Sequence, residues 1–214
     1  MEWEKQFREQ FRSRRNILNL PNCLTLFRIA LIPLLAVLLS GDADQPVFDK
    51  DFMFRYSNGR VAAFVVIIAG ITDLLDGYIA RMWKIESLFG KFLDPVADKL
   101  FLMVGLVMLM NLGRVEAWLV IVLLSRELLI TGLRGVAAGE GIIIAAGSTG
   151  KWKHTLQLIG LGFLMWYGSA FGFRAYEIGT VILYAALFIS LVSGYRYLSG
   201  FFVALREKRD RSVD

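Results

Sequence analysis

Residues 73–98 read DLLDGYIARMWKIESLFGKFLDPVAD and contain four aspartates, arranged as two pairs. Asp73 and Asp76 are three residues apart, and Asp94 and Asp98 are four residues apart. Side chains at either spacing lie on one face of an α-helix. Apolar sequence precedes the first pair and follows the second, which predicts two antiparallel helices joined by a short connection. The two pairs of carboxylates are therefore expected to face each other at one end of this hairpin.

Long apolar runs recur on both sides of this hairpin. Hydrophobic residues make up 56% of the 214 residues, and the mean hydropathy is +0.55. The apolar runs are about 20 residues long, which is the length that a helix needs to cross a bilayer. We therefore predict an all-α, polytopic membrane protein with six transmembrane helices, at residues 22–40, 60–81, 95–112, 117–138, 152–170 and 177–203. Acidic residues 41–58 and glycine-rich residues 139–150 are predicted to be connections.

The chain is predicted to have one membrane domain with a short segment at either end. In residues 1–20, Trp3, Phe7 and Phe11 are four residues apart, which favours an amphipathic helix in the membrane interface. A disordered basic segment is the alternative. Residues 21–204 form the predicted six-helix domain, and residues 205–214 form a basic tail.

The charge distribution predicts the orientation in the membrane. Net charge is +5, and the basic residues concentrate before the first span, after the second and at the end of the chain. Such loops face the cytoplasm, so both termini and the aspartates are expected on the cytoplasmic side. Basic residues beside apolar segments also favour lipid head groups and phosphates as partners rather than nucleic acid.

The four aspartates predict a metal site. Inserting one carboxylate near the middle of a bilayer costs about 2.5–3.5 kcal/mol, and mutual repulsion between four adds to this cost. Oxygen ligands favour Mg²⁺, with Mn²⁺ or Ca²⁺ as competitors. One alternative is a set of hydrated carboxylates paired with Arg81, Lys91 and Lys99. Another is a cation transporter, but the sequence shows no inverted repeat of the kind that transporters contain.

The spacing of these residues resembles a known family. The residues are Asp73, Asp76, Gly77, Ala80, Arg81, Gly90, Asp94 and Asp98, and together they are similar to the complete signature of the CDP-alcohol phosphotransferases. The resemblance implies a six-helix membrane fold, a homodimer, a CDP-linked donor and two bound ions, Mg²⁺ or Mn²⁺, held by the four aspartates. It also implies a site for the CDP-lipid formed by Asn22, Asp73, Gly77, Arg81 and Gly90.

Further stretches resemble the bacterial branch of this family that uses sn-glycerol 3-phosphate as the acceptor. They include Pro21–Arg28, Phe92–Lys99, Ser125–Glu127, Thr131–Arg134 and Gly150–Thr155. Arginine and lysine side chains near a metal site suit the phosphate of a small acceptor. The predicted acceptor-phosphate residues are Thr25, Arg28, Arg126, Arg134, Lys151 and Lys153. Arg126 could instead pair with Glu127, and the two lysines could be ordinary residues flanking a membrane span.

Together these patterns predict a reaction in a bacterial cytoplasmic membrane. The phosphatidyl group of CDP-diacylglycerol would pass to sn-glycerol 3-phosphate, releasing CMP. Asp94 and Asp98 are the predicted catalytic residues, with Asp98 as the base that takes the acceptor's proton; coordination of that hydroxyl by a metal is the alternative. Inositol phosphate, serine and phosphatidylglycerol remain alternative acceptors.

Overall fold

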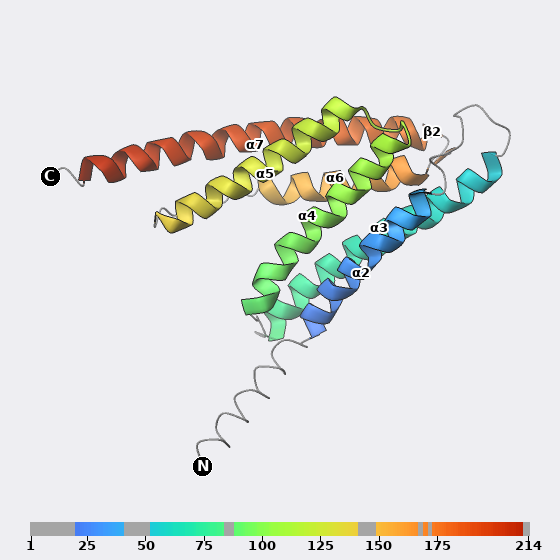
Figure 1. Ribbon diagram of the computed structural model, residues 1–214, viewed down its shortest axis with the longest axis horizontal. Helices are drawn as coiled ribbons and strands as arrows, with labels where there is room; N and C mark the ends of the chain where they lie inside the picture. The colour runs from blue at the N-terminus through green and yellow to red at the C-terminus, as the bar shows by residue number, and fades with distance from the viewer. Residues whose placement is uncertain are drawn as a thin grey trace, which may run out of the picture. The chain divides into compact units, whose positions relative to one another are not determined.

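A computed structural model describes residues 20–40, 52–83, 88–140, 149–166, 169–170 and 173–211. Within these residues the chain forms six helices and one two-stranded ribbon (Figure 1). The helices are α2 (Leu20–Ser40), α3 (Phe52–Trp83), α4 (Leu88–Asn111), α5 (Ala117–Gly139), α6 (Thr149–Trp166) and α7 (Ala175–Arg211). The strands β1 (Ser169–Ala170) and β2 (Phe173–Arg174) pair in antiparallel register between α6 and α7.

A helix is present at each of the six predicted positions, but some bounds differ. Helix α3 begins at Phe52, inside the predicted connection 41–58. Residues 52–58 include four large apolar or aromatic side chains and contain neither proline nor glycine, so they are compatible with a helix. Helix α6 ends at Trp166, so the prediction of helix to residue 170 was wrong. Gly168 and Gly172 disfavour a continuing helix there. The predicted amphipathic segment lies almost wholly outside the described residues.

Three of the described helices are long and apolar enough to cross a membrane. The corresponding stretches are Leu20–Ser40, Asn58–Ile79 and Ala175–Arg209. The other three helices carry charged side chains within their apolar stretch, such as Asp98 in α4, Arg126 in α5 and Lys153 in α6. Charged residues lower the hydropathy of a span and are retained where they have a function.

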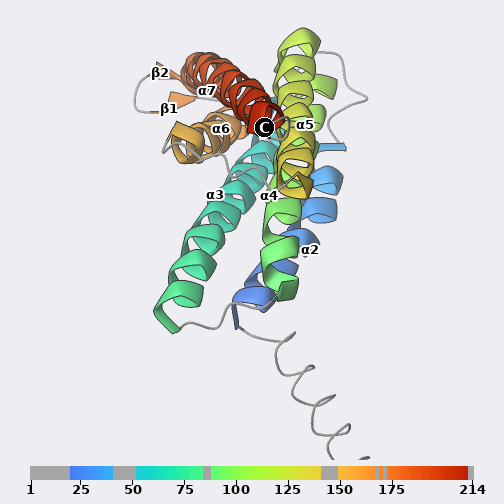
Figure 2. The same ribbon diagram turned by 90° about the vertical axis from the view of Figure 1, so that its left-hand side faces the viewer.

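The described helices fall into two compact units, Met1–Met108 and Leu109–Asp214. In the first unit α2 packs against α3, and the first turns of α2 and α4 lie at the same end as the last turns of α3 (Figures 1 and 2). One face of α2 is buried along its length; it consists of Pro21, Asn22, Thr25, Arg28, Leu31, Leu35 and Leu39. This face is polar in its first half and apolar in its second, so the polar part is confined to the end where the aspartates lie.

In the second unit α6 and α7 form the most extensive helix pair, joined by the β1–β2 ribbon (Figure 2). They approach closely at Gly160 and Gly179. A Cβ atom at Gly179 would lie 2.8 Å from Leu164 Cγ and 3.0 Å from the carbonyl oxygen of Gly160. Small residues allow this approach, as they commonly do between membrane helices.

The turn between α4 and α5 also anchors the end of α6. Gly113 has a positive φ of 66°, and the backbone N–H groups of Gly113 and Arg114 donate to the carbonyls of Met110 and Leu109, each at 2.9 Å. These two bonds form a Schellman motif, for which glycine is favoured. The motif directs the buried Arg114 side chain to the carbonyl oxygen of Met165, at 3.2 Å. A cation thus satisfies carbonyl groups at the C-terminus of α6.

Candidate active site

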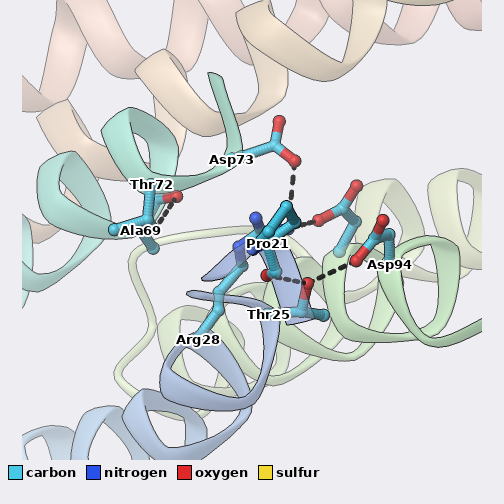
Figure 3. A network of polar contacts seen from close by, with 8 residues as sticks. Pro21, Thr25, Arg28, Ala69, Thr72, Asp73 and Asp94 are labelled. Atoms are coloured by element: carbon cyan, nitrogen blue, oxygen red, sulfur yellow. Dashed lines mark hydrogen bonds and ion pairs between the residues drawn. The ribbon is translucent and has the colours of Figure 1, made fainter. Parts of the chain in front are cut away.

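Asp73, Asp94 and Asp98 contact side chains in the first turns of α2, and Figure 3 shows Asp73 and Asp94 beside Thr25 and Arg28. Thr25 Oγ1 donates a hydrogen bond to Asp94 Oδ1. Arg28 Nη1 donates to Asp98 Oδ1 and lies 3.0 Å from Asp73 Oδ1. We call Thr25, Arg28, Asp73, Asp94 and Asp98 the aspartate cluster. It joins side chains from α2, α3 and α4 within the first unit, although residues 25 and 94 are far apart in the sequence.

Local sequence explains why α2 presents these groups. Thr25 and Arg28 are three residues apart and so lie on one face of the helix, and both are buried. The Thr25 hydroxyl is also 3.1 Å from the carbonyl oxygen of Pro21, which is the backbone contact expected of a threonine in a helix. Thr25 is therefore held in one orientation between its own helix and α4.

Burial is uneven within the aspartate cluster. The Arg28 side chain is 2% exposed, whereas Asp73 and Asp98 are 28% and 25% exposed. The guanidinium lies beneath the carboxylates, and each carboxylate keeps an accessible side. Breaking a buried ion pair by removing one partner costs about 3–5 kcal/mol, so Arg28 holds α3 and α4 to α2 at this end of the unit.

The aspartate cluster fits a divalent cation. A carboxylate oxygen of Asp73 and one of Asp98 lie within 4.8 Å of each other. Mg²⁺ binds oxygen ligands at about 2.0–2.1 Å, so only a small closure of these two oxygens would bring both onto one ion. The aspartates offer oxygen donors, which suit a hard cation. Asp76 lies on α3, but its side chain is outside the described ones.

The predicted CDP-lipid residues fall at the same end of the first unit. Asn22 is buried at the start of α2, and Gly90 is buried in the first turn of α4. Gly77 follows Asp73 by one helical turn, and a Cβ atom placed on it would have no described atom within 4 Å. Among the described residues, no atom fills the position that a side chain at Gly77 would take. The Arg81 side chain lies outside the described ones.

The second unit contains a buried charge cluster of its own. Glu127 Oε2 accepts hydrogen bonds from Lys153 Nζ of α6 and from Arg126 Nη1, the latter at 3.1 Å. The Arg126 and Lys153 side chains are each 10% exposed, and Glu127 is 22% exposed. We call these three residues the Glu127 cluster. Arg126 does pair with Glu127, and the same carboxylate also holds a cation from another helix.

The six predicted acceptor-phosphate residues are divided between the two units. Thr25 and Arg28 belong to the aspartate cluster, and Arg126 and Lys153 belong to the Glu127 cluster. Arg134 lies over the Tyr197 ring, with Cζ 5.4 Å from the ring centroid, in a cation–π contact. The Lys151 side chain lies outside the described ones.

Two residues of α7 that lie near Arg126, Gly194 and Ser190, are not among the predicted site residues. A Cβ atom on Gly194 would lie 3.0 Å from Arg126 Nε, so this glycine makes room for the arginine. Ser190 lies one turn earlier, is fully buried, and its Oγ has no hydrogen-bond partner among the described residues. A small polar residue four positions before a glycine in an apolar span was the available signal.

Comparison with known proteins covers most of this chain. The profile of the family described as CDP-alcohol phosphatidyltransferase matches residues 18–192. A Bacillus subtilis protein named CDP-diacylglycerol–glycerol-3-phosphate 3-phosphatidyltransferase is 39% identical over 191 residues, which cover 88% of this chain and 97% of that protein. Proteins of the same name from Haemophilus influenzae and Rickettsia bellii are 37% and 34% identical, each over 84% of this chain and over 91% and 93% of their own lengths.

Proposed function

The chain belongs to the CDP-alcohol phosphatidyltransferase family, and on that premise we propose that it transfers the phosphatidyl group of CDP-diacylglycerol to sn-glycerol 3-phosphate. The products are phosphatidylglycerophosphate and CMP, which makes it an enzyme of phospholipid biosynthesis. The observation that supports this function most directly is the convergence of Asp73, Asp94 and Asp98 on the first turns of α2. The names of the relatives support glycerol 3-phosphate as the acceptor.

The donor site in this proposal is the end of the first unit where the aspartates lie. Asp73, Asp76, Asp94 and Asp98 hold Mg²⁺ or Mn²⁺, as two ions. When bound, these ions neutralise the diphosphate of the donor and the charge that develops on the departing CMP. Asn22, Asp73, Gly77, Arg81 and Gly90 bind the cytidine diphosphate, and the lack of described atoms within 4 Å of a Cβ atom at Gly77 supports this placement.

The acceptor reacts through its hydroxyl group. That oxygen attacks the phosphorus that carries diacylglycerol, the bond from this phosphorus to the oxygen of CMP breaks, and the acceptor proton passes to a carboxylate oxygen of Asp98. Arg28 fixes the direction of the Asp98 carboxylate by donating to Oδ1. Asp94, held by Thr25, completes the catalytic pair.

The acceptor phosphate binds to cationic side chains. Arg126 and Lys153 gather at one point of the second unit, and Arg134 and Lys151 lie on the same two helices, α5 and α6. Thr25 and Arg28 provide further donors at the aspartates. A phosphorylated acceptor explains this excess of cations better than serine does, because serine has no phosphate to bind them.

We also propose six membrane spans, a homodimer and a location in the bacterial cytoplasmic membrane. Both termini and the aspartates face the cytoplasm in this arrangement, as the basic loops favour. The orientation is tested with a protease-sensitive tag at the C-terminus, which should be cleaved in inside-out vesicles and protected in intact cells. Cleavage in intact cells contradicts the orientation.

One assay tests the function. The purified protein in detergent micelles is given CDP-diacylglycerol with sn-glycerol 3-phosphate, inositol phosphate, serine or phosphatidylglycerol, and CMP release is measured with Mg²⁺, with Mn²⁺ and with EDTA. We expect metal-dependent CMP release, with the highest kcat/KM for glycerol 3-phosphate. A higher kcat/KM for any other acceptor contradicts the proposed acceptor, and CMP release undiminished by EDTA contradicts the role of the metal.

A further inference from the structure

In the Glu127 cluster one carboxylate contacts two cations that come from different helices. Arg126 and Lys153 come from two helices, and both have long side chains with many rotamers. Their nitrogens nevertheless meet at a single oxygen, Glu127 Oε2. Two cations brought this close repel each other, and a shared carboxylate offsets that repulsion. Glu127 therefore determines where the two cations meet.

The guanidinium of Arg126 keeps donor capacity beyond this contact. An arginine side chain has five N–H donors in a rigid fork, and Nη1 of Arg126 is directed to Glu127. Its Nε atom is buried and has no hydrogen-bond partner among the described residues. A buried donor without an acceptor is costly, so this nitrogen points to a polar group that binds here. An anion with several oxygens would satisfy it.

Helix α7 packs closely against Arg126 and brings a further polar group into this region. Gly194 has no side chain where it meets Arg126 Nε, and Ser190, one turn earlier, contributes a buried hydroxyl group with no partner among the described residues. Lys153 and Ser190 are also at the same level of the antiparallel pair α6–α7. A Cβ atom placed on Gly160 would lie 3.4 Å from Leu183 N, so these two residues are side by side. Lys153 is seven residues before Gly160 in α6 and Ser190 is seven residues after Leu183 in α7, which is about two turns along each helix in the same direction in space.

We propose that Glu127 is the positioning residue of the acceptor-phosphate site, and that it holds Arg126 and Lys153 together so that both bind one phosphate group. This inference rests on the proposed function for the identity of the acceptor. Glu127 does not touch the phosphate itself. It accepts one N–H from each cation and leaves their other N–H groups directed at the anion, with the Ser190 hydroxyl as a further donor.

The primary test compares Glu127→Gln with wild-type protein in the CMP-release assay. We expect the KM for sn-glycerol 3-phosphate to rise about tenfold, the effect of losing one charge-assisted hydrogen bond, while the KM for CDP-diacylglycerol stays unchanged. Glu140→Gln is the matched control, because Glu140 also forms an ion pair with a lysine, Lys208, at 2.7 Å in the same unit but in an exposed position. This control should leave both KM values unchanged.

A second variant keeps the charge and so protects the fold. Glu127→Asp withdraws the carboxylate by about 1.5 Å, the length of one carbon–carbon bond, so that it cannot reach both cations. We expect the same selective rise in the KM for glycerol 3-phosphate as in Glu127→Gln. A wild-type KM in Glu127→Asp contradicts positioning, because it shows that the negative charge alone is sufficient. A lower KM in Glu127→Gln also contradicts it, since Glu127 would then compete with the phosphate.

A binding measurement separates this inference from the proposed function. Inorganic phosphate and sn-glycerol 3-phosphate should each raise the Tm of wild-type protein and of Glu140→Gln, and should raise it much less in Glu127→Gln. If wild-type protein releases no CMP with glycerol 3-phosphate, the proposed function fails, but the phosphate-dependent Tm still tests Glu127. An equal rise in Tm in wild-type protein and Glu127→Gln overturns the positioning role.

Discussion

The two buried charge clusters of this protein have opposite arrangements. In the aspartate cluster one cation, Arg28, contacts the carboxylates of Asp73 and Asp98. In the Glu127 cluster one carboxylate contacts two cations, Arg126 and Lys153. Each cluster therefore has an excess of one sign of charge inside a chain that is mostly apolar. The first excess suits a divalent metal ion and the second suits a phosphate, so the two clusters are suited to different parts of one phosphoryl-transfer reaction.

The largest expected effect comes from Asp98→Asn in the aspartate cluster. This change removes the proposed base and a metal ligand, while the amide keeps the shape of the side chain. CMP release should fall by about 10²–10⁴-fold or more, the contribution typical of general base catalysis, while CDP-diacylglycerol binding remains detectable. The measurements are the initial rate of CMP release and binding of the radiolabelled donor. A variant with wild-type turnover would exclude Asp98 as the base.

Arg28→Gln should have the next largest effect, because it removes the buried cation between two carboxylates. Asp73 and Asp98 are about one quarter exposed, so the expected cost is below the ~3–5 kcal/mol of a fully buried pair, at about 2–3 kcal/mol. Thermal unfolding in EDTA should show a Tm lowered by about 5 °C or more.

Added Mg²⁺ should raise the Tm of Arg28→Gln by more than it raises the Tm of wild-type protein, since a divalent ion can replace the lost positive charge. Added phosphate should give no such recovery. Equal effects of Mg²⁺ on the two proteins would show that Arg28 does not neutralise the carboxylates, and the contrast between the clusters would then be lost.

A smaller effect is expected from Gly194→Ala beside the Glu127 cluster. The new Cβ atom would lie 3.0 Å from Arg126 Nε, so the guanidinium must shift by a few tenths of an ångström. The KM for glycerol 3-phosphate should rise about two- to fivefold, since crowding by one methyl group costs about 1 kcal/mol at the lower end of its range. The KM for CDP-diacylglycerol should not change.

Gly77→Ala is the counterpart of this change in the aspartate region. No described atom lies within 4 Å of the new Cβ atom, and alanine favours a helix more than glycine does. The Tm should therefore not fall, while the KM for CDP-diacylglycerol rises. If the two glycine variants affected the same substrate, the assignment of donor and acceptor to different clusters would be wrong.

The smallest effect concerns the exposed ion pair between Glu140 and Lys208. Lys208 donates a hydrogen bond to the Glu140 carboxylate, which lowers the pKa of that carboxyl below its ordinary value. A lowered pKa stabilises the folded protein above the ordinary pKa of glutamate, and this stabilisation is lost as the pH falls through the lowered value. Wild-type protein and Glu140→Gln should therefore have nearly equal Tm values at pH 7, and any difference should vanish in acid. A difference that grows as the pH falls would contradict this sign.

Much of this architecture was predictable from the sequence because the signals are local. Apolar runs of membrane-spanning length gave helices at all six predicted positions, and the spacing of Asp94 and Asp98 placed both on one face of α4. The errors also have local causes. The acidic residues before Phe52 and the polar residues just after it are typical of a connection, yet α3 begins at Phe52. The two glycines that follow α6 are a local signal for its earlier end.

The charge contacts were harder to predict because they join distant residues. Arg126–Glu127 is a contact between neighbours and was foreseen as one alternative, whereas Lys153–Glu127 spans 26 residues and was not foreseen. Arg28 was predicted to bind phosphate, and nothing local indicates that it contacts Asp73 and Asp98, which follow it by 45 and 70 residues. The space that Gly194 provides for Arg126 depends in the same way on the packing of α5 against α7.

The sequence by itself therefore determined the helices, their apolar faces, the family and the residue types available for chemistry, since each of these depends on composition and on spacing within a few turns. Only the tertiary structure decided which charges meet. An ion pair forms where two side chains are within a few ångströms, and that distance depends on how whole helices pack. For this reason the four aspartates could be recognised at once, while their buried partner Arg28 and the shared carboxylate of Glu127 emerged only from the folded chain.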